Sequence, residues 1–168
     1  MFKLELACME DLPVCMEILS SGRQFQRQQG FLQWPDGFPA TETVRNDILL
    51  GNGYVLRQGD TVAAYLYIGF DGDPYYPAIA GAWLNDAPYA VIHRIAIGSA
   101  FRGKGLADVV FSLAEDICRK QGVQNLRIDT HEENRRMQHI LEKNDYHCCG
   151  TVMQDNGLRL AYHKVFPL

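Results

Sequence analysis

Long apolar runs are missing from this sequence. No stretch approaches the roughly eighteen consecutive apolar residues that a membrane-spanning helix needs. The opening MFKLELACMEDLP reaches an acidic residue at Glu5, where a secretory signal would continue its apolar core. We therefore expect a cytoplasmic protein with no membrane partner.

An excess of positive charge is missing as well. Sixteen Lys and Arg residues stand against twenty Asp and Glu residues, which gives a formal net charge of −4. A surface with this balance repels phosphate backbones, and cations such as Arg23, Arg27, Arg135 and Arg136 are scattered along the chain. No nucleic-acid partner is expected.

The sequence also lacks a disulfide framework and a zinc motif. It has five cysteines, an odd number, and two of them, Cys148 and Cys149, are adjacent, so reduced thiols are the simpler interpretation. His131, His139 and His147 recur every eight residues, but neither a paired CxxC nor tetrahedral zinc spacing accompanies them. We expect no metal.

The composition that remains is typical of a soluble globular domain. Of 168 residues, 47% are hydrophobic and 21% are charged, and the chain shows neither an internal repeat nor a linker. We expect one domain that spans residues 1–168.

Hydrophobic periodicity predicts an alternation of strands and helices. Single strands are expected over residues 2–7, 90–97 and 125–130. A pair of strands is expected over 54–70, with its turn at Gln58-Gly59-Asp60, and a closing hairpin over 146–166, with its turn at Asn156-Gly157. Expected helices cover residues 9–21, with Gly22 beyond the end, 41–51, 106–121 and 133–144. The glutamine-rich residues 23–40 and the turn-rich residues 71–89 are expected to be irregular.

The strand at 90–97, the helix at 106–121 and the strand at 125–130 form a βαβ unit. Its first connection contains Arg102-Gly103-Lys104-Gly105. Two glycines let the backbone approach a ligand, the helix start offers unpaired N–H groups, and two cations add full charge. This loop is either a cradle for a diphosphate or an ordinary glycine-rich turn. Two other glycine-rich cradles, G-x-x-x-x-G-K-S/T and an N-terminal G-x-G-x-x-G, are absent.

The pattern R-x-x-G-x-G/A occurs here as Arg102 to Ala107. HRIAI precedes it, and Asn134 and LEKNDY follow about thirty residues later. In these features the chain resembles the GNAT superfamily of acyl-CoA-dependent N-acetyltransferases, over most of its length and most sharply over residues 91–150. The resemblance implies an α/β (α+β) GNAT fold, in which a mixed, mostly antiparallel central sheet is splayed at the cofactor site and helices cover both faces.

The resemblance also implies a set of cofactor-binding residues. In the family, the pyrophosphate of acetyl-CoA rests on the amides of the motif, and the pantetheine arm pairs with the preceding strand. Carried over to this chain, the set is Ile95, Ala96, Ile97, Arg102, Gly103, Lys104, Gly105, Leu106, Ala107 and Asn134. Asn134 has the alternative interpretation of an ordinary helix N-cap.

His93 is the candidate catalytic base. Strand alternation is expected to place it on the face of Ile95 and Ile97, beside the thioester, and an imidazole accepts a proton at neutral pH. The arylalkylamine branch of the family has a histidine at the matching position, whereas a merely hydrogen-bonded strand histidine is the alternative. Many relatives protonate the departing thiolate with a tyrosine that is Leu141 here, which leaves Tyr146, Tyr162 or solvent for that role.

The expected reaction moves an acetyl group from the co-substrate acetyl-CoA to a primary amine of a small molecule, amino acid or peptide, by direct attack in a ternary complex. The alternative, motivated by Leu141, is a non-catalytic acyl-CoA-binding sensor or structural module of the same fold. A homodimer is a further expectation, because dimers are frequent among relatives. Aromatic residues that either line the acceptor side or pack in the core are Trp34, Tyr65, Tyr67, Tyr75, Tyr76 and Trp83.

Overall fold

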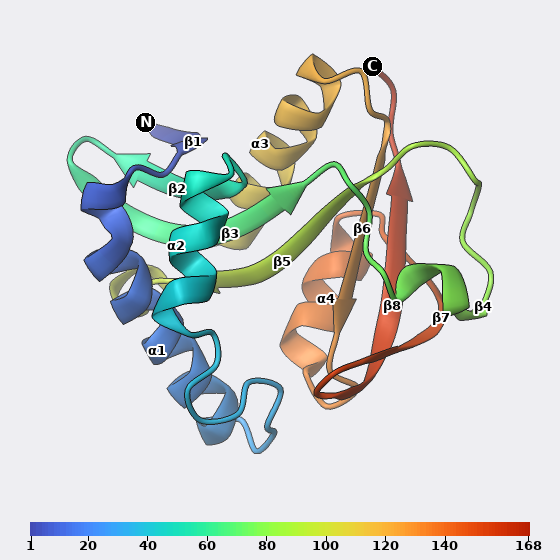
Figure 1. The fold of residues 1–168 in the computed structure, drawn as a ribbon, viewed down its shortest axis with the longest axis horizontal. Helices are drawn as coiled ribbons and strands as arrows, with labels where there is room; N and C mark the ends of the chain where they lie inside the picture. The colour runs from blue at the N-terminus through green and yellow to red at the C-terminus, as the bar shows by residue number, and fades with distance from the viewer.

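An eight-stranded sheet forms the centre of the computed structural model, which describes residues 1–168 (Figure 1). Its strands are β1 (Phe2–Leu6), β2 (Gly53–Gln58), β3 (Thr61–Gly69), β4 (Ala80–Gly81), β5 (Ala90–Ile97), β6 (Asn125–Thr130), β7 (His147–Gln154) and β8 (Gly157–Val165). They lie in the order β1-β2-β3-β5-β6-β8-β7-β4, and every neighbouring pair is antiparallel except β5 and β6. The expected mixed, mostly antiparallel α/β fold is confirmed.

Helices cover both faces of this sheet, as expected. The α-helices are α1 (Leu12–Gln28), α2 (Thr41–Leu49), α3 (Leu106–Lys120) and α4 (Arg135–Lys143), and short 3-10 helices occur at Met9–Asp11, Tyr76–Ala78 and Ser99–Phe101. α1 and α2 bury Leu19 and Val44 in one apolar cluster, whereas α3 and α4 bury Phe111 and Leu141 in a second, larger one. No helix is both long and apolar enough to span a membrane.

Helix α1 is longer than the sequence predicts. We expected it to end before Gly22 and irregular structure to follow, but the helix continues for seven more residues, from Gly22 to Gln28. Gly22 is needed for close packing: a Cβ atom there would lie 3.1 Å from the Cβ of Ala96 and 3.2 Å from the Trp34 ring. The missing side chain therefore lets the helix approach β5 and the loop that carries Trp34.

The sheet opens between its two parallel strands. β5 and β6 pair only through Ala90 with Leu126 and Val91 with Arg127, whereas β6 and β8 pair along six residues. In Figure 1 the two strands meet near the upper right, and β5 then runs to the left while β6 runs downward. The expected splay is confirmed, and the remaining residues of both strands face the gap that it creates.

A bulge in β5 changes which side chains share a face. Arg94 and Ile95 together stand opposite the single residue Leu66, because Ala96 pairs with Tyr65 and His93 pairs with Tyr67. The expected simple alternation is therefore wrong: Ile92, not His93, packs in the same apolar cluster as Ile95 and Ile97.

The backbone of Arg94 has a left-handed φ of 50°, a conformation that costs free energy for a residue with a side chain. Two hydrogen bonds of 2.7 and 2.8 Å from the Arg94 guanidinium to the Asp47 carboxylate of α2 hold it there. The Tyr65 hydroxyl donates to the same carboxylate at 2.6 Å. Charged hydrogen bonds thus fix the bulge that turns β5 beside the gap.

Candidate functional site

Two adjoining cavities lie in the opening of the sheet. The loop cavity, of about 360 Å³, is lined by β5 residues Ile95 to Ile97, by Arg102, Gly103 and Gly105 of the loop before α3, and by Leu106 to Asp108 at the start of α3. The histidine cavity, of about 280 Å³, is lined by His93, Asp73, Asp129 and other polar residues. Gln26, Trp34, Ile95, Asn134 and Met137 line both cavities. Whatever occupies one cavity therefore lies next to whatever occupies the other.

The loop cavity presents unpaired backbone donors. The N–H groups of residues 103–105 donate to no carbonyl or side chain of the protein, and the first N–H groups of α3 have no intrahelical acceptor. Gly103 and Gly105 have left-handed φ values of 75° and 73°, and a Cβ atom at either would meet nothing within 4 Å. The bend is thus not filled by its own side chains, and it can receive an anion.

Cations gather around these amides. Arg102 and Arg136 both line the loop cavity, with their guanidinium carbons 4.4 and 5.4 Å from the centroid of the Phe25 ring. Burial and the neighbouring Arg136 charge lower the pKa of Arg102. An anion bound here would relieve the repulsion between the two guanidinium groups.

The structure brings together nearly all of the predicted cofactor-binding residues. Ile95, Ala96, Ile97, Arg102, Gly103, Gly105, Leu106, Ala107 and Asn134 all line the loop cavity. Lys104 does not line it and is exposed, with its ammonium nitrogen 6.0 Å from the Phe101 ring centroid. Asn134 is an N-cap, because its side chain accepts from the Met137 N–H at 3.1 Å, and it also lines both cavities.

His93 is held by a buried carboxylate in the histidine cavity. Its Nε2 lies 2.9 Å from Asp73 Oδ2, and its side chain is 24% exposed. Burial alone would raise the pKa of Asp73, but hydrogen bonds from His93 and from the Tyr75 N–H outweigh it and lower that pKa. Asp73 therefore stays ionised and fixes the imidazole orientation, which leaves Nδ1 without a protein partner.

A second carboxylate, Asp129, lies in the same network. It accepts from the Tyr76 hydroxyl at 2.8 Å, and the Gln154 amide nitrogen lies within 3.3 Å of both Asp129 and Asp73. Burial raises the pKa of Asp129, in contrast to Asp73. The histidine cavity thus holds two carboxylates with opposite shifts beside one imidazole, an arrangement suited to binding an amine and removing its proton.

Two further polar residues line the histidine cavity. Thr130 is 1% exposed, and its hydroxyl has no hydrogen-bond partner. Arg159 is 4% exposed and forms no ion pair. Both side chains line the cavity from the C-terminal half of the sheet, on β6 and β8.

The tyrosines considered for protonating a thiolate lie elsewhere. Leu141 is fully buried in the larger apolar cluster, and Tyr146 and Tyr162 are buried in that same cluster. Neither tyrosine lines either cavity. Tyr146 packs on Phe111 with ring centroids 5.5 Å apart, which is a core contact.

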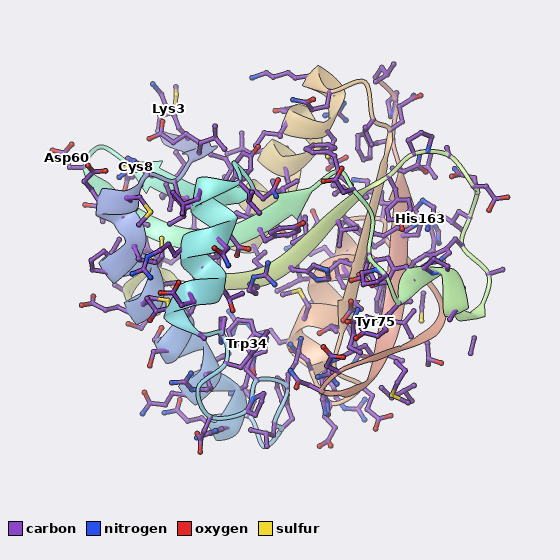
Figure 2. The ribbon with its side chains drawn as sticks, in the orientation of Figure 1. Lys3, Cys8, Trp34, Asp60, Tyr75 and His163 are labelled. Atoms are coloured by element: carbon purple, nitrogen blue, oxygen red, sulfur yellow. The ribbon has the colours of Figure 1, made fainter.

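The aromatic residues divide between the core and the site. Trp34 is buried and lines both cavities, and Figure 2 shows it between the N-terminal helices and the C-terminal half of the sheet. Tyr65 and Tyr76 are fully buried, and each donates its hydroxyl hydrogen to an aspartate. Of the six aromatics considered, Trp34 alone lines a cavity.

Sequence reasoning missed Asp73, Asp129, Thr130 and Arg159. Asp73 lies in a turn-rich segment, where an aspartate ordinarily indicates a turn. Asp129 and Arg159 alternate with apolar residues along β6 and β8, a pattern typical of a solvent-facing side of a strand. The available signal was the accumulation of charge on those two strands, which pair with each other.

Comparisons with known proteins agree with this geometry. The family model described as the acetyltransferase (GNAT) family matches residues 19–146. A GNAT-family acetyltransferase from Streptococcus agalactiae is 34% identical, with a TM-score of 0.91 over 99% of this chain and 96% of that one. No curated protein matches the sequence.

More distant solved structures share the fold. A GNAT-family acetyltransferase from Listeria monocytogenes is 20% identical, with a TM-score of 0.77 over 98% of this chain and 95% of that one. The PaiA N-acetyltransferase of Thermoplasma acidophilum, solved in complex with coenzyme A, is 13% identical, with a TM-score of 0.72 over 99% of both chains. The family model matches most of this chain, and the chain shares a third of its residues with the streptococcal protein. This chain therefore belongs to the GNAT family of acetyltransferases.

Proposed function

We propose that this protein is an acetyl-CoA-dependent N-acetyltransferase that acts on a primary amine of a small molecule, amino acid or peptide. The observation that carries the proposal is the pair of adjoining cavities at the opening between β5 and β6. One is lined by unpaired amides and cations, and the other by a histidine–carboxylate pair. Family membership gives the acetyltransferase class, and the two cavities support the proposal that each substrate has its own binding region.

The lining of the loop cavity offers groups that suit the diphosphate and the pantetheine arm of coenzyme A. The open N–H groups after Arg102 and the guanidinium groups of Arg102 and Arg136 would hold the two phosphoryl groups. Ile95 to Ile97 would lie along the pantetheine arm, because β6 has already left the side of β5 at these residues. When bound, acetyl-CoA supplies an acetyl thioester whose carbonyl carbon accepts the amine nitrogen and releases the CoA thiol.

His93 is the proposed base. An amine enters as an ammonium ion and must lose a proton before its nitrogen can attack. The imidazole takes that proton at Nδ1, directly or through one water, while Asp73 holds Nε2 and stabilises the cation that forms. The proton then passes to solvent, to which the His93 side chain is partly exposed.

The leaving thiolate needs no tyrosine in this proposal. A thiolate is a tolerable leaving group at neutral pH, and solvent can protonate it. Thr130 is a candidate donor for the acyl oxygen, because its unpartnered hydroxyl lines the cavity in which the amine would bind.

The test is release of free thiol from acetyl-CoA across a panel of primary amines, with CoA binding measured separately by calorimetry. Saturable thiol release that needs both the amine and the protein supports the proposal. Absence of CoA binding would contradict it.

A second candidate is a non-catalytic acyl-CoA-binding module of the same fold. The observation that favours it is Leu141, fully buried where many relatives carry the thiolate-protonating tyrosine. Tight CoA binding without thiol release from any amine in the panel would favour this candidate over the enzyme.

A further inference from the structure

Arg159 is a buried cation without an anionic partner. Its guanidinium donates only to main-chain carbonyl oxygens, those of Leu158 at 3.0 Å, Gln33 at 3.2 Å and Asn156 at 3.4 Å. A buried charge that is not neutralised is costly to fold around. The protein retains one at the wall of the histidine cavity.

The other buried or half-buried arginines make the contrast clear. Arg57 pairs with Glu5 and Asp11, and Arg94 pairs with Asp47. Arg127 lacks a carboxylate, but its guanidinium carbon lies 4.3 and 3.8 Å from the ring centroids of Trp83 and Tyr89, and it lines neither cavity. Arg102 also lacks a carboxylate partner and lines the loop cavity, but it is only half-buried. Of the two fully buried arginines, Arg127 and Arg159, only Arg159 lines a cavity.

The Arg159 guanidinium also has N–H groups that donate to no protein acceptor. A guanidinium has five N–H groups, and the three recorded hydrogen bonds use two on Nη2 and one on Nη1. The Nε–H group and the second Nη1–H group have no acceptor. A carboxylate can accept a charge-assisted hydrogen bond from either of these groups, as a single bond, because the two groups lie on different edges of the guanidinium.

The same cavity carries the opposite charge elsewhere on its wall. Asp73 and Asp129 lie beside His93, where an ammonium group would be neutralised and then deprotonated. Asp129 and Arg159 form no direct ion pair, although each charge stabilises the other: Arg159 acts to lower the pKa of Asp129, and Asp129 acts to raise the pKa of Arg159. A cavity of about 280 Å³ with both charges on its wall suits a small zwitterion.

We propose that the acceptor is a free amino acid, and that Arg159 binds its carboxylate while the amine lies at His93 and Asp73. The proposal rests on the acetyltransferase function proposed above and narrows its substrate class. A peptide amine has no free carboxylate beside it, so this site would select against peptides.

The test uses matched pairs of acceptors. Each amino acid is compared with the amine left when its carboxylate is removed: L-leucine with 3-methylbutylamine, L-phenylalanine with 2-phenylethylamine, and L-methionine with 3-(methylthio)propylamine, extended over the common amino acids. Thiol release gives kcat/KM for each member. For the preferred amino acid we expect a ratio of at least about 30-fold over its amine, the cost of leaving one partner of a buried charge pair unpaired.

The Arg159→Met variant should reduce that ratio to near one while CoA affinity stays unchanged. Arg45→Met is the matched control, because Arg45 lies on α2 outside both cavities, and its ratio should equal that of the wild type. Arg159→Lys keeps the charge but not the guanidinium geometry, and we expect an intermediate ratio. It also replaces Arg159→Met if the latter fails to fold.

The outcomes separate the two proposals. Thiol release that is equal for every amino acid and its amine would overturn the amino-acid proposal and leave the acetyltransferase proposal intact. So would thiol release that is equal for each free amino acid and for a dipeptide with that amino acid at its N-terminus. Thiol release from no acceptor at all would overturn the acetyltransferase proposal itself. Because wild-type selectivity is measured without any variant, the inference is testable even if no substitution at Arg159 folds.

Discussion

His93 lies where the sheet opens, with one imidazole nitrogen held by Asp73 and the other facing no protein group. We expect His93→Ala to lower kcat/KM by about 10²-fold or more, because general base catalysis is lost. CoA affinity should be unchanged, because His93 does not line the loop cavity. Thiol-release assays would measure kcat/KM, and calorimetry would measure CoA affinity.

The control for that substitution is His147→Ala. His147 is an exposed histidine on β7 that lines neither cavity, so its removal should leave turnover near the wild-type rate. Wild-type turnover in His93→Ala, or equal losses in both variants, would remove His93 from the mechanism.

His163 is the opposite case, a fully buried histidine with both ring nitrogens occupied. Its Nδ1 accepts from the Leu84 N–H at 3.1 Å, and its Nε2 donates to Asn125 Oδ1 at 2.8 Å. Burial, together with the nearby Arg127 charge, lowers the pKa of His163 to about 4. Protonation would place a hydrogen on Nδ1 and break the bond to Leu84.

This shift makes stability depend on pH in a defined direction. The pKa of His163 in the unfolded chain is about 6.5. Above that pH, the neutral side chain contributes fully to the free energy of unfolding, and this contribution is lost as the pH falls toward about 4. The loss should approach about 3 kcal/mol of unfolding free energy. Denaturant titrations at pH 7.5 and 4.5 should show a larger drop for the wild type than for His163→Gln. If NMR of the folded protein showed that the His163 imidazole itself titrates near pH 6.5, this prediction would be contradicted.

Single residues also show where sequence reasoning stops. The glycines and cations of the Arg102 to Ala107 loop could be identified because their chemistry is local to one turn. Arg159 and Asp129 could not, because their function depends on facing a cavity formed by segments far apart in the chain. A charged residue between two apolar ones looks the same whether its face of the strand meets water or a ligand.

At the scale of elements, the start of α3 supports a prediction about the loop cavity. Gly105 is the residue before the helix, and its φ of 73° leaves open space where a side chain would be. We expect Gly105→Asp to lower CoA affinity by about tenfold or more, equivalent to about 1.4 kcal/mol, because a carboxylate would project toward the bound phosphates. Calorimetric titration with CoA measures the change.

A matched variant separates this effect from backbone strain. Gly59 has a similar φ of 59°, also with open space around it, in the turn between β2 and β3. Its neighbour Asp60 lies at the left edge of Figure 2, away from Trp34. Gly59→Asp should lose similar stability but bind CoA like the wild type. Unchanged CoA affinity in a folded Gly105→Asp protein would argue against the phosphate cradle.

Most elements could be predicted from periodicity, because each strand or helix carries its own apolar pattern. The βαβ unit and the C-terminal hairpin are in this group. The end of α1 could not be predicted, because glycine is ordinarily a helix terminator and the packing partners of Gly22 come from Trp34 and Ala96, which are distant in sequence. The β5 bulge left no local signal either, since Arg94 is fixed there by Asp47 of another element.

At the scale of the whole molecule, the splay of the sheet followed from the family resemblance and from no pattern in the residues. Strand patterns indicate which residues face a core, but not how far two neighbouring strands remain paired. β5 and β6 pair at only two positions, and α1 and α4 pack in different apolar clusters. The site therefore exists only at the level of the complete fold.

The two cavities share a wall, and neither is lined by a cysteine or a serine. Cysteine and serine, the usual carriers of an acyl group, are thus missing at the junction, and Thr130 and His93 of the histidine cavity have the proposed roles of oxygen donor and base instead. Initial rates measured at several concentrations of both substrates should therefore give double-reciprocal lines that intersect, and CoA should inhibit competitively against acetyl-CoA. Parallel lines would reveal a covalent carrier. In the proposed reaction each substrate would occupy its own cavity, so neither would need to leave before the other arrives.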